Sequence, residues 1–463
     1  MTQHVRVPQL SADENDLVNG LLDRLAAKSV RNAVRASVYD GRRAVQQIGS
    51  VIPPAYSRVA FALGWGAKGV DGLARRCNLD GMIWTGGDLD SLGYRELVDA
   101  NFLISELSQA RTDSLIYGVS YLVTTQGGPG EPAALVHVRD AMNATGEWNV
   151  RRRRLDNLLT VSSRDDAGVS GFTLYLDGVT ITATREESRW DVARLRHHWH
   201  VPADPLVYRP RASRPMGRSR ITRPVMAIQD AALRALVRLE AHMDIYAIPK
   251  LMLLGADESI FKNPDGSFKA SWQVAMGRVF GVPDDEDASN PRVEVEQFDA
   301  SSPEPHLAHL NALAKMMSRE TDLPDSDFAL TDMANPTSAE AYGASRENLI
   351  AEAEGAMDDW SVPIRRTVTR ALAIQNGLPE VPPEWEGITT KWRSPIYLSR
   401  SAEADAGSKQ VVAVPWLAET EVGLELLGLD PQQIERALAE KRRAAGRAVI
   451  AALGANGLGD SSA

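Results

Sequence analysis

The chain has 463 residues, 44% of them hydrophobic and 24% charged, and a formal net charge of −10. This length and apolar content predict roughly two to four domains with hydrophobic cores of their own, whereas the negative charge argues against a general nucleic-acid binder. No uncharged apolar run approaches the roughly 18 residues of a membrane span, and residues 1–15 lack a secretion signal, so neither a membrane partner nor secretion is expected.

Cys77 is the only cysteine, which excludes a disulfide within the chain and a metal cluster built from several thiolates. A catalytic thiol would need a placed histidine, and the sequence does not indicate one. We therefore interpret Cys77 as a small core or surface residue.

The first half of the chain alternates between helical and strand periodicity. Apolar residues at helical spacing predict helices over residues 16–39, 68–76 and 92–115. After Tyr117 the period changes to two, which predicts strands near 119–123, 135–138, 158–161, 171–176, 179–183 and 195–200. A meandering antiparallel sheet flanked by helices makes the predicted fold class α+β.

The stretch from residue 215 to residue 347 organises the rest of the chain. Apolar side chains on one stripe predict a helix over 222–248, and it would be about 40 Å long; they are Val225, Ile228, Ala232, Leu236, Leu239, Met243 and Tyr246. After Pro249, strand signals near 251–255 and 293–298 enclose a turn at 263–266. The helical period returns over 303–322, so two antiparallel helices carry a small module away from the rest.

A loop over 325–336 then leads to a capping box formed by Thr337 and Glu340. The helix that it opens is predicted to continue to Asn376, with a bend at Pro363. Near the C-terminus, Asp430 and Pro431 form the start of another helix, as cap and first-turn residue.

Several local features invite an enzymatic interpretation, and none of them supports it. His198 and His200 share one face of the strand predicted at 195–200, but no third metal ligand has a recognisable spacing. The basic run at 151–154 is read as a solvated hairpin or a subunit contact, and the acidic run at 284–287 lacks the glycine and terminal glutamate of a calcium loop. The glycines at 127–130 lack the Lys-Ser/Thr of a phosphate loop. We predict no enzyme, no cofactor and no metal.

A series of short motifs between about residue 17 and residue 445 has the order and spacing of a known family. They are Tyr39-Asp40-Gly41 with Ile52-Pro53, Leu115-Ile116-Tyr117-Gly118-Val119-Ser120-Tyr121, Val201-Pro202 with Tyr208-Arg209-Pro210 and Gly217-Arg218-Ser219, Pro249 with Leu254-Gly255, Pro336-Thr337-Ser338-Ala339, Trp392 with Pro395, Ala404-Asp405-Ala406 with Lys409, and Leu427-Gly428-Leu429. Together they resemble the portal proteins of tailed, siphophage-type bacteriophages. Two parts look short for that family: the module between the two long helices, and the C-terminal helical part.

The resemblance implies a ring, typically of about twelve subunits, at one vertex of the capsid. Double-stranded DNA would be packaged and ejected through this ring. The implied partners are the terminase large subunit, the head-tail adaptor, and the major capsid and scaffolding proteins. The implied location is the virion, with the host cytoplasm during assembly.

The resemblance also implies a division of the chain into the parts of a portal subunit. These are the N-terminal part of the wing (1–216), a stem helix (217–248), a small α/β clip (249–302), a second stem helix (303–322), a tunnel loop (323–336), a long bent helix with a return to the wing (337–419), and a helical crown with a flexible tail (420–463).

Charge then suggests which residues meet DNA or partners. Carboxylates let DNA slide, whereas lysines and arginines along a bore would hold it. We expect Asp325, Asp327, Asp332 and Asn335 near the bore, and Lys262, Lys269 and Arg278 as clip charges that face partners. A basic cluster in the crown, Lys441, Arg442, Arg443 and Arg447, either touches packaged DNA or forms a solvated face. The first stem helix is expected to carry a polar face with Gln229, Asp230, Arg234 and Arg238.

Two other classes of function fit parts of the pattern. A non-conducting scaffold or adaptor of the virion would share the sheet and the helical hairpin but would stay monomeric or dimeric. A nuclease acting on the phage genome would need clustered carboxylates that bind a divalent ion. Neither alternative accounts for the full order of the motifs.

Overall fold

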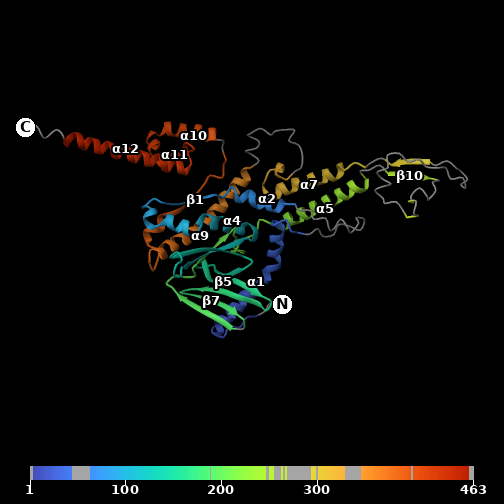
Figure 1. Ribbon diagram of the computed structural model, residues 1–463, viewed down its shortest axis with the longest axis horizontal. Coiled ribbons are helices and arrows are strands. Elements are labelled where there is room, and N and C mark those ends of the chain that lie inside the picture. Colours follow the sequence, from blue (N-terminus) through green and yellow to red (C-terminus); the bar gives the residue numbers. More distant parts are fainter. Residues whose placement is uncertain are drawn as a thin grey trace, which may run out of the picture. The chain divides into compact units, whose positions relative to one another are not determined.

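The computed structural model describes residues 4–43, 63–187, 189–246, 250–254, 262–263, 266–267, 294–298, 301–328, 346–397 and 400–457. The chain divides into two compact units, Met1–Arg393 and Ser394–Ala463 (Figure 1). The boundary that the sequence placed between residues 419 and 420 therefore lies inside the second unit. No helix within the described ranges is long and apolar enough to cross a membrane.

A five-stranded antiparallel sheet with one helix across it forms part of the first unit. Its strands pair in chain order: β4 (Ala144–Asn149), β5 (Arg154–Asp165), β6 (Gly168–Leu176), β7 (Val179–Glu186) and β8 (Arg189–Arg196). Helix α1 (Ala12–Tyr39) begins with a capping box between Ser11 and Glu14. Its buried Leu21 and Leu25 share a core with Phe172 of the sheet. The predicted meander is confirmed.

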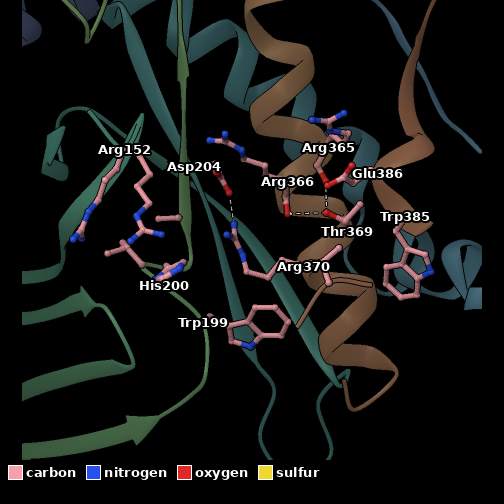
Figure 2. Close-up of a pocket in the computed structure, with 14 residues that line it drawn as sticks. Arg152, Trp199, His200, Asp204, Arg365, Arg366, Thr369, Arg370, Trp385 and Glu386 are labelled. Carbon is pink, nitrogen blue, oxygen red and sulfur yellow. Dashed lines mark hydrogen bonds and ion pairs between the residues drawn. The ribbon is translucent and has the colours of Figure 1, made fainter. Parts of the chain in front are cut away.

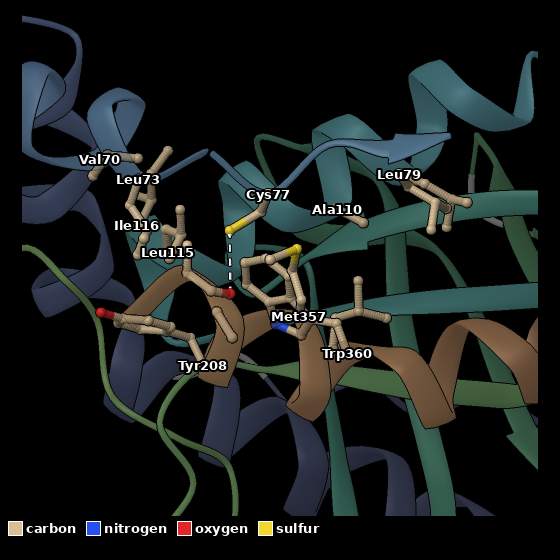
Figure 3. Close-up of a cluster of buried hydrophobic side chains, with 14 of the residues drawn as sticks. Val70, Leu73, Cys77, Leu79, Ala110, Leu115, Ile116, Tyr208, Met357 and Trp360 are labelled. Carbon is tan, nitrogen blue, oxygen red and sulfur yellow. Dashed lines mark hydrogen bonds between the residues drawn. The ribbon is translucent and has the colours of Figure 1, made fainter. Parts of the chain in front are cut away.

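A three-stranded sheet has the order β3-β2-β9, with β2 (Val119–Gln126), β3 (Ala134–Asp140) and β9 (Ala203–Val207). Helices α4 (Leu103–Tyr117) and α9 (Glu347–Gln375) pack against it. They share the main core with α2 (Trp65–Ala74) and with the antiparallel pair β1 (Leu79–Trp84) and β12 (Ile388–Trp392). Short elements complete this region: η2 (Asp90–Leu92), α3 (Tyr94–Ala100) and η5 (Pro383–Gly387). Figure 3 shows the centre of the core, where Cys77, Met357 and Trp360 gather.

Two helices that are distant in sequence lie side by side and run in opposite directions (Figure 1). They are α5 (Arg223–Tyr246) and α7 (Glu304–Thr321), which we call the helix pair. The chain between them contains β10 (Lys250–Leu254) and β11 (Glu294–Phe298), paired antiparallel. In the predicted turn, the Gly266 N–H donates to the Asn263 carbonyl at 2.9 Å, and Gly266 has φ +85°. Both helices, both strands and the turn were predicted, and all are confirmed.

The second unit is helical in its described part. Its elements are α10 (Arg400–Ala413), η6 (Pro415–Glu419), α11 (Glu421–Leu426) and α12 (Pro431–Gly457). Asp430 caps α12 as predicted, because its carboxylate accepts the Gln433 N–H at 2.8 Å while the Gln433 side chain accepts the Asp430 N–H. Within the stretch expected to form a helical crown with a flexible tail (420–463), this helix continues to Gly457.

The single helix predicted over 92–115 is wrong, because the chain breaks between α3 and α4. The Asn101 amide donates to the Ala134 carbonyl at 3.0 Å and accepts the Val136 N–H at 2.8 Å, so it binds the backbone of β3. The next residue, Phe102, takes a left-handed conformation with φ +48°. Apolar periodicity continues across the break, so it did not reveal the bond that Asn101 makes to a distant strand.

The strand predicted over 195–200 is also misplaced, because β8 spans Arg189–Arg196 and ends before the histidines. His198 and His200 therefore do not share a strand face. The His200 ring lies 3.0 Å from the Asp177 carboxylate in an exposed pair. Among the described residues, no group of three or more His, Cys, Asp or Glu side chains is placed to hold a metal ion.

Phe102→Gly is expected to raise the free energy of unfolding by about 0.5–1 kcal/mol. Glycine adopts the left-handed conformation without the steric cost of a Cβ, and this gain exceeds its greater entropy loss on folding. Phe102 is 77% exposed, so little packing is lost. Urea unfolding measures the change. Phe102→Ala keeps the Cβ and is the matched control, and equal stabilisation by alanine would contradict this explanation.

Candidate functional surfaces and their anchor

The base of the helix pair is part of the main core. Val225, Ile228 and Ala232 of α5 are buried there, together with Leu310, Leu313 and Met317 of α7. Their spacing of three and four residues is the helical stripe that the sequence predicted. Both helices expose charged side chains of both signs: Arg238 and Glu240 on α5, and Lys315, Arg319 and Glu320 on α7.

Two residues expected on the polar face of α5 lie elsewhere. Gln229 is 1% exposed, and its side-chain oxygen accepts the Gly66 N–H of α2 at 2.7 Å. Asp230 is half-buried and forms a two-pronged ion pair with Arg43, at 2.6 and 2.7 Å. The prediction of an exposed Gln229 is wrong, because this amide satisfies a backbone donor inside the core instead of facing water.

A buried arginine just before α5 joins four separate elements. Arg220 donates through Nε to the Gly69 carbonyl of α2 at 2.6 Å, and through Nη2 to the Thr321 carbonyl at the end of α7. Its Nη1 pairs with Glu352 of α9 and donates to the Tyr208 hydroxyl, which follows β9, at 3.1 Å. One guanidinium therefore fastens the start of α5 and the end of α7, which together form the base of the helix pair, to the core.

The electrostatics of this cluster favour the charged form of Arg220. The side chains of Arg220 and Glu352 are only 6% and 5% exposed. Burial opposes the charge on Arg220, but Tyr208 and Glu352 outweigh it, so the pKa of Arg220 is raised. Glu352 also accepts from the Tyr208 hydroxyl and pairs with Arg209 at 2.9 Å. We call Arg220, Glu352 and Tyr208 the anchor cluster.

Sequence analysis did not predict the anchor cluster, although the sequence contains one sign of it. Glu352 stands among Leu349, Ala353, Ala356 and Met357, which are buried on one side of α9. A carboxylate on an apolar stripe needs a buried partner. The identity of that partner depends on the tertiary fold and cannot be read from spacing.

The residues expected near a bore are only partly described. Asp325 and Asp327 form a turn of 3₁₀ helix, η4 (Asp325–Asp327), directly after α7. Asp325 is exposed, whereas the Asp327 carboxylate lies 3.7 Å from Lys68 Nζ of α2. The next residue, Phe328, is buried edge-on against Trp65, with ring centroids 5.8 Å apart. Asp332, Asn335 and the capping box at 337–340 lie outside the described residues.

The residues expected to meet partners are likewise described in part. Lys262 is half-buried beside the turn at 263–266, whereas Lys269, Arg278 and the acidic run at 284–287 lie outside the described residues. In the second unit, Lys441, Arg442, Arg443 and Arg447 are all exposed on α12, and Lys441 Nζ lies 3.5 Å from the Glu419 carboxylate.

A basic cleft lies between α9 and the β4–β5 hairpin (Figure 2). It has a volume of about 420 Å³, and we call it the α9 cleft. Arg365, Arg366 and Arg370 come from α9, and Arg152 and Arg154 come from the hairpin. Asp204 pairs with Arg370, and Glu386 also lines the cleft, so carboxylates offset part of the charge. Exposure of residues 151–153 at the hairpin tip agrees with the predicted solvated hairpin.

Cys77 is buried in the core as a structural residue. Its Sγ lies 3.8 Å from the Ala353 carbonyl (Figure 3). Burial raises the pKa of the Cys77 thiol to about 12, so the reactive thiolate is scarce at neutral pH. The interpretation of Cys77 as a core residue is confirmed.

Asp113 of α4 is a half-buried carboxyl whose pKa is shifted by burial and by a second carboxylate. Burial, and then the charge of Asp140, raise its pKa to about 7. Folding therefore favours the protonated form of Asp113 at mildly acidic pH.

Comparisons with known proteins give the following matches. Residues 25–447 match the family described as phage portal protein, SPP1 Gp6-like. The chain is 25% identical over 386 residues to the portal protein of Mycobacterium phage L5, covering 81% of this chain and 78% of that protein. It is 26% identical over 383 residues to the portal protein of Mycobacterium phage D29, with coverage of 81% and 77%.

Similar solved structures come from gene transfer agent particles. The neck of a native particle, computed with C12 symmetry, matches 79% of this chain and 90% of that chain, with a TM-score of 0.42 and 16% identity. The virion of a native particle matches 86% and 94%, with a TM-score of 0.41 and 14% identity.

Arg220→Ala is expected to lower the free energy of unfolding by about 3 kcal/mol, because the buried Glu352 carboxylate loses its buried cation and keeps only Arg209, which is half exposed, and the Tyr208 hydroxyl. The double variant Arg220→Met/Glu352→Leu should be less destabilised than the single variant, since no uncompensated charge remains. Denaturant unfolding measures both. The control is Arg24→Ala, which breaks the exposed Arg24–Glu147 pair and should cost less than about 1 kcal/mol. A double variant with a lower free energy of unfolding than Arg220→Ala would refute the structural role of the Arg220–Glu352 pair.

The stability of the chain should depend on pH through Asp113. Its folded pKa of about 7 lies above the ordinary value of 3.8, so the folded state binds more protons between these values and its stability falls as pH rises through them. Asp113→Asn should flatten this decline, measured as the thermal midpoint between pH 5 and pH 7.5. An equally steep decline in the variant would contradict the assignment.

Proposed function

The chain belongs to the SPP1 Gp6-like family of phage portal proteins, and from this premise we propose that it forms a closed ring of about twelve subunits that conducts double-stranded DNA. It is a portal protein of phage-like particles. Its family is structural, and the known role of the family is DNA packaging and capsid assembly at the capsid vertex of the virion.

The observation that carries the ring proposal is the anchored helix pair. Its base is fixed by the anchor cluster, and its charged faces present both signs to the surroundings. Exposed charges of both signs on the helix pair suit a heterologous contact, in which each subunit binds the next one head to tail. Such a contact gives a closed ring when its rotation closes and an open filament when it does not, and membership of the portal family favours the closed ring.

We assign the parts of the subunit on this basis. The α5–α7 helix pair is the stem, and β10 and β11 belong to the clip. The two sheets, with α1, α4 and α9, make up the wing. The crown, residues 420–463 with α12, lies within the second unit, which begins at Ser394.

The bore is assigned to the segment that follows α7. Asp325 is exposed there and leaves its charge available to repel phosphates, and Asp332 and Asn335 belong to the same proposed loop. Asp327 has a different role, because its pairing with Lys68 holds the start of the loop against α2. A negative lining lets DNA slide, since it releases no counterions from the duplex.

The partners follow from the same assignment. The clip, with Lys262, Lys269 and Arg278, would contact the terminase large subunit during packaging and the head-tail adaptor afterwards. The wing and crown would contact the major capsid and scaffolding proteins. The exposed crown bases Lys441, Arg442, Arg443 and Arg447 would meet packaged DNA. The subunit would assemble in the host cytoplasm and end in the virion.

Ring formation is tested by native mass spectrometry of the full chain, together with end-on negative-stain images. We expect a closed assembly of about twelve copies with a central hole. Particles that carry DNA and are purified from infected cells provide the second sample, because the capsid can be needed for closure. A compact monomer or dimer in both samples would contradict the proposal and favour the non-conducting adaptor.

A further inference from the structure

A second basic cleft lies between α1 and the segment before α5, and we call it the α1 cleft. Three cations come from one face of α1, where Lys28, Arg31 and Arg35 are three, four or seven residues apart. Arg214 and Arg218 come from the segment before α5. The cleft has a volume of about 180 Å³, and Tyr117, Val119 and Tyr121 also line it.

The charges of the α1 cleft are unbalanced. Its lining contains five cations and no carboxylate, and none of the five forms an ion pair with a carboxylate within the ranges that the structure covers. Asp40, Asp113 and Asp140 act electrostatically on Tyr117 in the wall, but none of them lines the cleft. The α9 cleft differs, because Asp204 and Glu386 line it.

The cations of the α1 cleft destabilise one another. Burial, then Arg24 and Arg31, lower the pKa of Lys28, and no carboxylate opposes them. Burial, then Arg31 and Arg214, lower the pKa of Arg35 to about 10. Arg35 donates to the Tyr117 carbonyl at 3.1 Å and to Asn32 at 3.2 Å, yet its buried Nε has no hydrogen-bond partner in the described chain. An anion in the cleft would relieve this repulsion.

We propose that the α1 cleft is a binding site for a compact multivalent oxyanion of the phosphate type. The volume admits a group of this size, and several positive charges favour a divalent group over a single carboxylate. Arginine supplies planar, forked donors for phosphate oxygens and lysine supplies a point charge. Free phosphate and a phosphate of a nucleic-acid backbone share this chemistry. All residues of the site belong to one chain. The proposal is therefore separate from the proposed ring and does not depend on it.

Isothermal titration calorimetry of the full chain with sodium phosphate, at constant ionic strength in chloride buffer, tests the proposal. We expect saturable binding, with one phosphate per chain. Lys28→Gln/Arg35→Gln should weaken this binding at least about tenfold, because two charge-assisted contacts are lost. The matched control is Arg152→Gln/Arg365→Gln in the α9 cleft, which removes the same net charge and should leave phosphate binding unchanged.

A thermal scan separates loss of the site from loss of the fold. In chloride, Lys28→Gln/Arg35→Gln should melt at or above the midpoint of the wild type, because it removes two half-buried cations that repel their neighbours. Added phosphate should raise the midpoint of the wild type and of the control, but not that of the variant. Equal phosphate stabilisation of all three proteins would overturn the proposal.

A short DNA duplex, titrated into the phosphate-loaded protein, identifies the source of the oxyanion. Displacement of phosphate that depends on Lys28 and Arg35 would assign the site to a nucleic-acid backbone, and retention of phosphate would assign it to the free ion. Both results support an oxyanion site. If the heat released on adding phosphate to the wild type did not saturate, the oxyanion site would be refuted.

Discussion

The buried contact between Arg220 and Glu352 is the constraint on which the rest of the first unit depends. It stands where α2, α7, α9 and the segment after β9 meet. Because a guanidinium has donors in several directions, a single side chain satisfies two backbone carbonyls and a carboxylate. The same residue lies just before α5 and donates to the end of α7, so both helices are fixed at the base of the helix pair. If the helix pair is the stem of a ring, as proposed, it would need a base that is held rigidly in this way.

Charge is distributed unevenly over this acidic chain. The net charge of −10 suits a conduit through which DNA slides. Against this background the first unit gathers basic side chains in two clefts: Asp204 and Glu386 partly neutralise one, and no carboxylate lines the other. The net charge of the whole chain does not reveal these local concentrations. The electrostatic properties of the two clefts therefore follow from the tertiary structure more than from the total charge.

Most of the secondary structure could be predicted, because apolar periodicity reports local burial. The stripe of α5, the meander from β4 to β8 and the Asp430 cap follow from short-range patterns and are confirmed. Three of the failures share one cause. Asn101 and Gln229 each bind the backbone of a distant element, and the Glu352 partner is 132 positions away in the chain, counted from Arg220. Hydrogen bonds of this kind leave no periodic signal.

Hydrogen–deuterium exchange of Glu352→Gln, compared with the wild type in the full chain, tests the role of the anchor cluster most directly. If Arg220 couples the four elements, amides in α2, in the last turn of α7 and in the first turns of α5 exchange faster together, while α1 and the sheet from β4 to β8 remain unchanged. Faster exchange confined to the turn of α9 around Glu352 would show that the contact is local. That result would contradict the claim that the Arg220–Glu352 ion pair holds the base of the helix pair.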